Sequence, residues 1–135
     1  MQYFLAKTEP DTYSIENLQM EGWSNWNGVR NPQAVAFIKE MEIGDKVFIY
    51  HSGMNAAIVG IAEVIKAPEA DPDDKKSWTV GLQHLETFKT PITLKEIKAT
   101  GKFEDFRLVY QSRLSTMDVP AEFVAWLKKE KRINC

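Results

Sequence analysis

Cysteine is almost missing from this sequence: the 135 residues contain one, at the last position, and only two histidines. One cysteine cannot form an internal disulfide, and no Cys/His spacing resembles a zinc site. We therefore expect no metal, no cofactor and a reducing compartment, which is the cytoplasm or, in a eukaryote, the nucleus. No apolar run approaches the roughly 20 residues that span a bilayer, so no membrane partner is expected.

An excess of one charge is also lacking, since 17 Lys and Arg stand against 19 Asp and Glu. Proteins that coat nucleic acid through its phosphates alone are normally basic, so this balance argues against that class. It is compatible with a pocket for one base or one small ligand. The apolar fraction of 44% and the charged fraction of 27% are typical of a globular chain, and the length predicts one domain over residues 1–135.

The spacing of apolar residues predicts an α+β fold. Strands are expected at residues 3–7, 46–52, 57–65 and 78–85, and helices at 14–20, 31–41, 93–99 and from 120 onward. Residues 23–31 show neither period, 68–76 are expected to be a solvated loop, and 107–110 and 114–116 to be short irregular or strand-like pieces. Because three strands follow one another without long crossovers, we expect a curved, mostly antiparallel sheet or barrel with flanking helices.

The segment Trp26-Asn27-Gly28-Val29-Arg30-Asn31 is the first candidate for a functional site. Asn31 caps the start of an expected helix, so free backbone N–H groups lie close to Trp26 and Arg30. A flat aromatic ring beside hydrogen-bond donors suits a nucleobase, through stacking on the ring and readout of the base edge. The alternative is that Trp26 is a core residue and Arg30 a surface ion-pair partner.

Two further segments carry polar groups where elements end. Tyr50-His51-Ser52 leads from a strand into a loop, and alternation predicts that Tyr50 and Ser52 share one face while His51 takes the other. Arg113-Leu114-Ser115 offers the planar donors of a guanidinium between two turns. Trp23 is expected in a loop, where it can act as a lid, and Trp78 on a strand face that is more often core.

Catalysis is not expected from these residues. Adjacent Ser52 and His51 point away from each other on a strand, so they cannot form a nucleophile–base pair, and no Gly-x-Ser-x-Gly elbow is present. The acidic residues of 68–76 stand in a polar loop, where nothing would raise a carboxyl pKa. We therefore expect a protein that is not an enzyme.

Motifs spread over nearly the whole chain are together more specific than any one of them. They are Lys7-Thr8-Glu9-Pro10, Trp26-Asn27-Gly28-Val29-Arg30-Asn31, Gly44-Asp45, Tyr50-His51-Ser52, Val59-Gly60-Ile61-Ala62-Glu63-Val64, Trp78 and Arg113-Leu114-Ser115. In their order and approximate spacing they resemble the EVE domain family of the PUA-like superfamily. The resemblance implies a PUA-like pseudobarrel, a curved, mostly antiparallel sheet with helices closing its ends.

The resemblance also implies a base-binding site. Family members are thought to bind nucleic acid that contains a modified base, flipped into an aromatic-lined pocket. The positions that match the family's motifs are Lys7, Thr8, Trp26, Arg30, Asn31, Tyr50, His51, Ser52, Arg113, Leu114 and Ser115, with Trp23 and Trp78 as a lid or flank.

The hypothesis that follows is a non-catalytic reader of a modified base in DNA or RNA. The alternatives are a pocket for a free modified nucleoside or other small ligand, a protein-interaction module, and an enzyme that acts on the flipped base.

Overall fold

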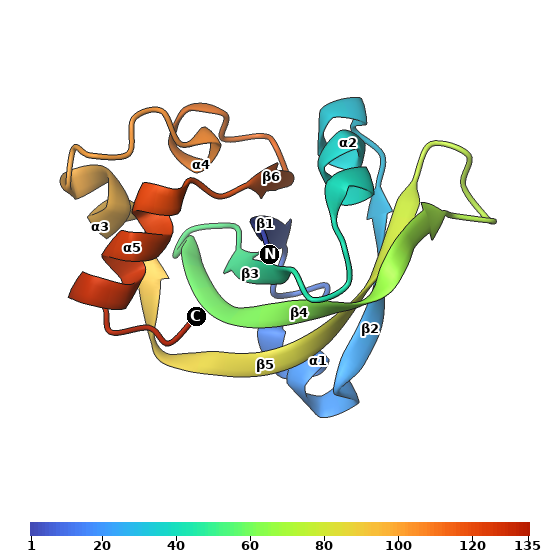
Figure 1. The fold of residues 1–135 in the computed structure, drawn as a ribbon, viewed down its shortest axis with the longest axis horizontal. Coiled ribbons are helices and arrows are strands. Elements are labelled where there is room, and N and C mark those ends of the chain that lie inside the picture. The colour runs from blue at the N-terminus through green and yellow to red at the C-terminus, as the bar shows by residue number, and fades with distance from the viewer.

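A single curled sheet of six strands organises the computed structural model, which describes residues 1–135 (Figure 1). The strands are β1 (Tyr3–Thr8), β2 (Trp23–Val29), β3 (Lys46–His51), β4 (Ala57–Ala70), β5 (Trp78–Thr93) and β6 (Thr116–Asp118), in the spatial order β2-β5-β4-β3-β1-β6. Only β1 and β3 pair in parallel; every other pair is antiparallel. The predicted curved, mostly antiparallel sheet with flanking helices is confirmed.

Five helices cover the sheet: α1 (Ile15–Glu21), α2 (Pro32–Glu40), α3 (Leu94–Ala99), α4 (Arg107–Tyr110) and α5 (Ala121–Glu130). In Figure 1, α3, α4 and α5 gather at one end of the curl, and α2 lies towards the other. The first group is held together by aromatic rings, since the Phe123 ring centroid lies 5.0 Å from that of Phe103 and 4.8 Å from that of Phe106. No helix is both long enough and apolar enough to cross a membrane.

The curl is concentrated in β4 and β5, whose two long ribbons bend together (Figure 1). Their register shifts at several places, as in β-bulges, which bend and twist a strand. Gly60 lies at one shift, where an added Cβ would be 2.4 Å from the carbonyl oxygen of Glu86. At Gly81 it would be 2.4 Å from the Cβ of Lys66. Only glycine therefore allows the two strands to approach this closely.

Three local expectations differ from the structure. Residues 23–29 form β2, because a bulge at Asn27-Gly28 interrupts the alternation that marks a strand. β4 continues to Ala70 because its polar end pairs with the start of β5 in a solvent-exposed hairpin, which needs no apolar side chains. β5 continues to Thr93 because its second half pairs with the buried start of β4 and buries Phe88 and Ile92. Arg107–Tyr110 is the short helix α4.

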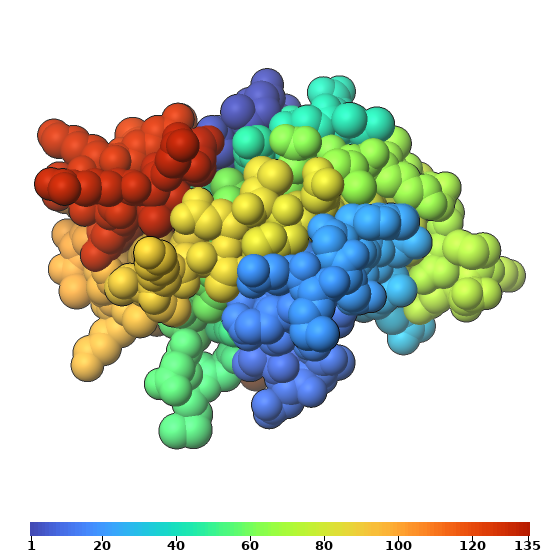
Figure 2. All heavy atoms as spheres, turned by 90° about the horizontal axis from the view of Figure 1, so that it is seen from below, coloured from blue at the N-terminus to red at the C-terminus, as the bar shows by residue number.

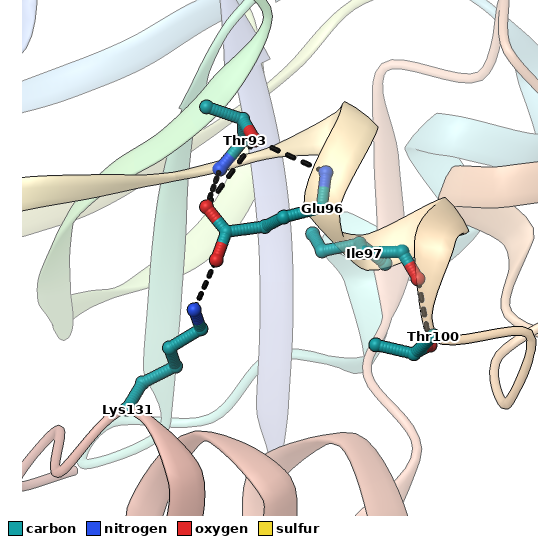
Figure 3. A network of polar contacts seen from close by, with 5 residues as sticks. All are labelled: Thr93, Glu96, Ile97, Thr100 and Lys131. Atoms are coloured by element: carbon teal, nitrogen blue, oxygen red, sulfur yellow. Dashed lines mark hydrogen bonds and ion pairs between the residues drawn. The ribbon is translucent and has the colours of Figure 1, made fainter.

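The expected caps of α2 and α3 are present. The Asn31 carboxamide accepts a hydrogen bond from the Ala34 N–H and so begins α2. The Thr93 hydroxyl and the Glu96 carboxylate form the predicted capping box of α3, and Glu96 also pairs with Lys131 beyond α5 (Figure 3). Burial raises the pKa of Glu96, but the hydrogen bonds from Lys131 and Thr93 outweigh it, so the pKa lies below its ordinary value.

We predict that Gly60→Ala lowers the free energy of unfolding by about 1–3 kcal/mol, because the new methyl group overpacks against the Glu86 backbone. Urea denaturation measures the change. Ala70→Val, which enlarges an exposed position of the same strand, is the matched control and is expected to change stability by less than about 0.5 kcal/mol. Equal stability of Gly60→Ala and the wild type would show that the strands are not in close contact there.

Candidate functional site

A pocket lies at the seam where the curled sheet fails to close on itself. Because β1 lies near one end of the strand order and β2 at the other, the curl brings the two strands to face each other across a pocket of about 490 Å³. Residues of β1, of the turn before α1, of β2 and of the segment before β6 line it: Lys7, Thr8, Thr12, Tyr13, Ser24–Val29, Arg30 and Ser115. Five of the predicted site residues are thus brought together: Lys7, Thr8, Trp26, Arg30 and Ser115.

The polar wall contributed by β2 depends on its bulge. β2 is the edge strand, and its pairing with β5 shifts between Trp26 and Val29. Gly28 has a φ of 80°, a conformation that other residues rarely adopt. The kink leaves Asn27 and Gly28 without strand partners at the pocket and turns the chain towards α2, which places Arg30 at the pocket rim.

The Lys7 ammonium lies at the opposite wall and is well fixed. Its Nζ donates a hydrogen bond of 2.8 Å to the Ser112 carbonyl and lies 5.3 Å from the centre of the Tyr50 ring. The Lys7 N–H also donates to the Ser115 carbonyl at 2.8 Å, which holds that segment beside β1. Burial lowers the pKa of Lys7. The pocket therefore contains a positioned cation with donor hydrogens that Ser112 does not use.

Trp26 is both a core residue and a pocket residue. It is only 8% exposed and belongs to the continuous apolar core. The Tyr13 ring meets it edge-on at 6.0 Å, and the Tyr13 hydroxyl donates to the Glu21 carboxylate. Burial, followed by that hydrogen bond, raises the pKa of Tyr13. The two rings form the apolar part of a wall that is otherwise polar.

The segment Tyr50-His51-Ser52 lies outside this pocket. Tyr50 is 3% exposed and supports Lys7 from behind. His51 Nε2 accepts the Ile15 N–H at 3.0 Å and so caps the first turn of α1. Ser52 donates from its N–H and from its hydroxyl to the Thr8 carbonyl. All three residues therefore make structural contacts around the pocket, Tyr50 through its ring and the other two through hydrogen bonds. His51 and Ser52 line a separate surface cleft.

Three other expected residues are also directed elsewhere. The Asn31 side chain is occupied as the cap of α2 and, with Arg113, borders a different hollow. Leu114 is buried in the core. Trp26, Tyr50 and Arg113 therefore do not line one cavity: Trp26 lines the pocket, Tyr50 is buried beside Lys7, and Arg113 borders the other hollow.

The two tryptophans expected at the lid or flank are separated. Trp23 is 46% exposed at the start of β2 and does not line the pocket. Trp78 lies in a neighbouring cleft that shares Arg30 with the pocket.

Several pocket residues carry no signal in the sequence. Thr12 and Tyr13 follow a turn, and Ser24, Asn25 and Asn27 stand in the stretch that shows no periodicity. Interpreting this stretch as a strand with a bulge at Gly28 would have predicted that its side chains lie along one edge of the sheet. The pocket offers hydroxyl and carboxamide groups as donors and acceptors, two cations and an aromatic wall. No three His, Cys, Asp or Glu side chains come together to hold a metal ion.

This arrangement defines a class of domain: a curled half-barrel with a polar, aromatic-backed pocket in its open seam. Residues 2–130 match the family model of the EVE domain. The chain is 31% identical to thymocyte nuclear protein 1 of Rattus norvegicus in an alignment that covers 89% of this chain and 69% of the rat protein. The chain therefore belongs to the EVE domain family, as the motifs predicted.

Solved structures agree on the fold. An NMR structure from Rhodopseudomonas palustris is 35% identical and superposes with a TM-score of 0.89, covering 100% of this chain and 97% of that one. A crystal structure from Pseudomonas putida is 35% identical with a TM-score of 0.86, covering 93% and 96%. Human THYN1, crystallised with DNA containing 5-methylcytosine, is 23% identical with a TM-score of 0.87 and covers all of both chains.

We predict that His51 makes stability depend on pH. Burial lowers its pKa below 6.5, more than the nearby Glu16 carboxylate raises it. The unfolded chain therefore takes up the proton first, so this contribution is intact above about pH 7 and is lost as the pH falls through 6.5 towards the lower folded pKa.

Thermal melts between about pH 8 and pH 5 test this. His51→Gln keeps an acceptor for the Ile15 N–H without a titrating ring, so it is expected to melt like the wild type at the upper pH and to lose less stability at the lower one. Adding His84→Gln is expected to remove the remaining histidine-dependent slope, since the chain has two histidines. An unchanged slope in His51→Gln would contradict the prediction.

Proposed function

We propose that this chain binds nucleic acid that carries a modified base, without catalysing a reaction, and that the base enters the pocket between β1 and β2. The observation that carries the proposal is the convergence of Lys7, Trp26 and Arg30 in one pocket. Lys7 comes from β1, near one end of the strand order, whereas Trp26 and Arg30 come from β2 at the other end and from the residues after it, so the three meet only because the sheet curls.

The size and chemistry of the pocket suit a flipped base. A volume of about 490 Å³ lies within the range of small-molecule sites and exceeds what one heterocycle needs. Trp26 and Tyr13 supply apolar contact. Lys7 supplies charged donors for base carbonyl or ring nitrogen atoms, and the Asn25 and Asn27 carboxamides can both donate and accept, as the mixed edge of a base requires.

The comparisons favour a methylated base. Human THYN1, which has the same fold, was crystallised with DNA containing 5-methylcytosine. A methyl group buried against Trp26 and Tyr13 would gain about 0.8 kcal/mol, or about a fourfold preference over the unmodified base. DNA and RNA differ in the sugar, which lies outside a pocket that holds only the base, so the binding assay includes both. The reducing compartment inferred from the cysteine count remains a prediction.

We predict that Trp26→Ala weakens binding of a short single-stranded DNA with one 5-methylcytosine by about 1–3 kcal/mol, because a stacked or edge contact with the base is lost. Fluorescence anisotropy measures the affinity for this DNA, for its unmodified form and for the matching RNA. Trp26→Phe, which keeps the core filled, is expected to bind with intermediate affinity.

Trp23→Ala is the matched control, since it removes an exposed tryptophan from the same strand outside the pocket. Circular dichroism confirms that each variant folds. If Trp26→Phe and Trp26→Ala both bind the methylated strand as tightly as the wild type, the proposed site is refuted. Free 5-methylcytidine that raises the melting temperature as much as the oligonucleotide would identify the small-ligand alternative.

A further inference from the structure

A second cleft adjoins the pocket and has a different charge. It has a volume of about 490 Å³, and its charged lining residues are Arg30, Lys39, Lys75 and Lys76. We call these four residues, with Trp78, the cationic cleft. No acidic residue lines it, although the whole chain has a net charge of −2. Arg30 lines both openings, so the cationic cleft begins where the pocket ends.

The lysines of the cleft come from two elements that face each other. Lys39 lies near the end of α2, and its Nζ is 4.7 Å from the centre of the Trp78 ring, which restricts where the ammonium can lie. Lys75 and Lys76 are exposed on the loop between β4 and β5. Figure 2 shows that loop, in light green, standing out from the molecule beside β2, in blue. The ammonium groups are therefore open to a partner from solvent.

Arg30 is occupied by an acidic residue of the same loop. Its Nε lies 3.0 Å from Asp74 Oδ2, and the other Asp74 oxygen accepts the Lys76 N–H at 3.0 Å. The Arg30 side chain is nevertheless 60% exposed, so this ion pair is solvated and weak. A phosphate offers the guanidinium the same two-oxygen geometry as a carboxylate and can replace it.

We propose that the cationic cleft binds the sugar–phosphate backbone of the nucleotides next to the base in the pocket, and that Asp74 masks Arg30 until a phosphate displaces it. The proposal rests on the proposed function, because the backbone reaches the cleft from a base held by Trp26. Because Arg30 lines both the pocket and the cleft, it contacts the phosphate next to the bound base and so fixes where the backbone enters the cleft. Lys75, Lys76 and Lys39 contact the phosphates that follow.

The salt dependence of binding tests the cleft separately from the pocket. Each Lys that neutralises a phosphate contributes about 0.7 to the slope of log affinity against log salt for a single strand. The double variant Lys75→Gln/Lys76→Gln is therefore expected to lower the slope by about 1.4 for methylated and unmodified DNA alike, with an unchanged ratio between them. Lys89→Gln/Lys102→Gln removes two exposed charges elsewhere and is expected to keep the wild-type slope.

The mask is tested by removing the charge of Asp74 while keeping its shape. Asp74→Asn retains the acceptor for the Lys76 N–H and frees Arg30, so affinity is expected to rise about twofold to fivefold. Asp73→Asn removes the same charge from the neighbouring position, which makes no side-chain contact with Arg30, and is expected to give a smaller rise. In an Arg30→Gln background, the two Asn variants are expected to bind alike.

The outcomes separate the two proposals. A wild-type slope in Lys75→Gln/Lys76→Gln, together with intact preference for the methylated strand, overturns the cationic cleft and leaves the pocket in place. Equal effects of Asp74→Asn and Asp73→Asn overturn the mask. Inorganic phosphate is added as a competitor at the same concentration as the phosphate groups of the oligonucleotide. If it displaces the oligonucleotide, and does so only when Lys75 and Lys76 are present, the cleft is a site for free anions instead. No binding of any oligonucleotide by the wild type overturns the pocket and the cleft together.

Discussion

The close approach of β4 and β5 at Gly60 and Gly81 is the constraint on which the rest of the molecule depends. At both positions a Cβ would lie 2.4 Å from an atom of the neighbouring strand. Without the bend that these contacts allow, β1 and β2 would stand at distant places in an open sheet. With it, they face each other, and the pocket is the seam that the half-barrel leaves open.

The two walls of the seam differ in the contacts and side chains that form them. On the β1 side, Lys7 is held between the Ser112 carbonyl and the Tyr50 ring, and Ser115 is fixed by a backbone hydrogen bond. On the β2 side, an edge strand with a bulge presents short polar side chains over the buried Trp26. The pocket thus has the hydrogen-bonded Lys7 ammonium on one wall and hydroxyl and carboxamide groups, with Arg30, on the other.

The regular part of the fold could be predicted because its signals are local. The cap at Asn31, the capping box at Thr93 and the apolar strand 46–52 each depend on a few neighbouring residues, and each is present. β2 was missed because the bulge at Gly28 breaks its alternation.

The site was only partly predictable because a motif says that residues matter without saying where their side chains point. His51, Ser52 and Asn31 match the motifs, yet their hydrogen bonds go to the scaffold: His51 begins α1, Asn31 begins α2, and Ser52 ties to Thr8. The bend of β4 and β5 also sets how far apart β1 and β2 stand across the pocket. A substitution at Gly60 or Gly81, which do not line the pocket, would therefore alter its width while every lining residue stayed the same.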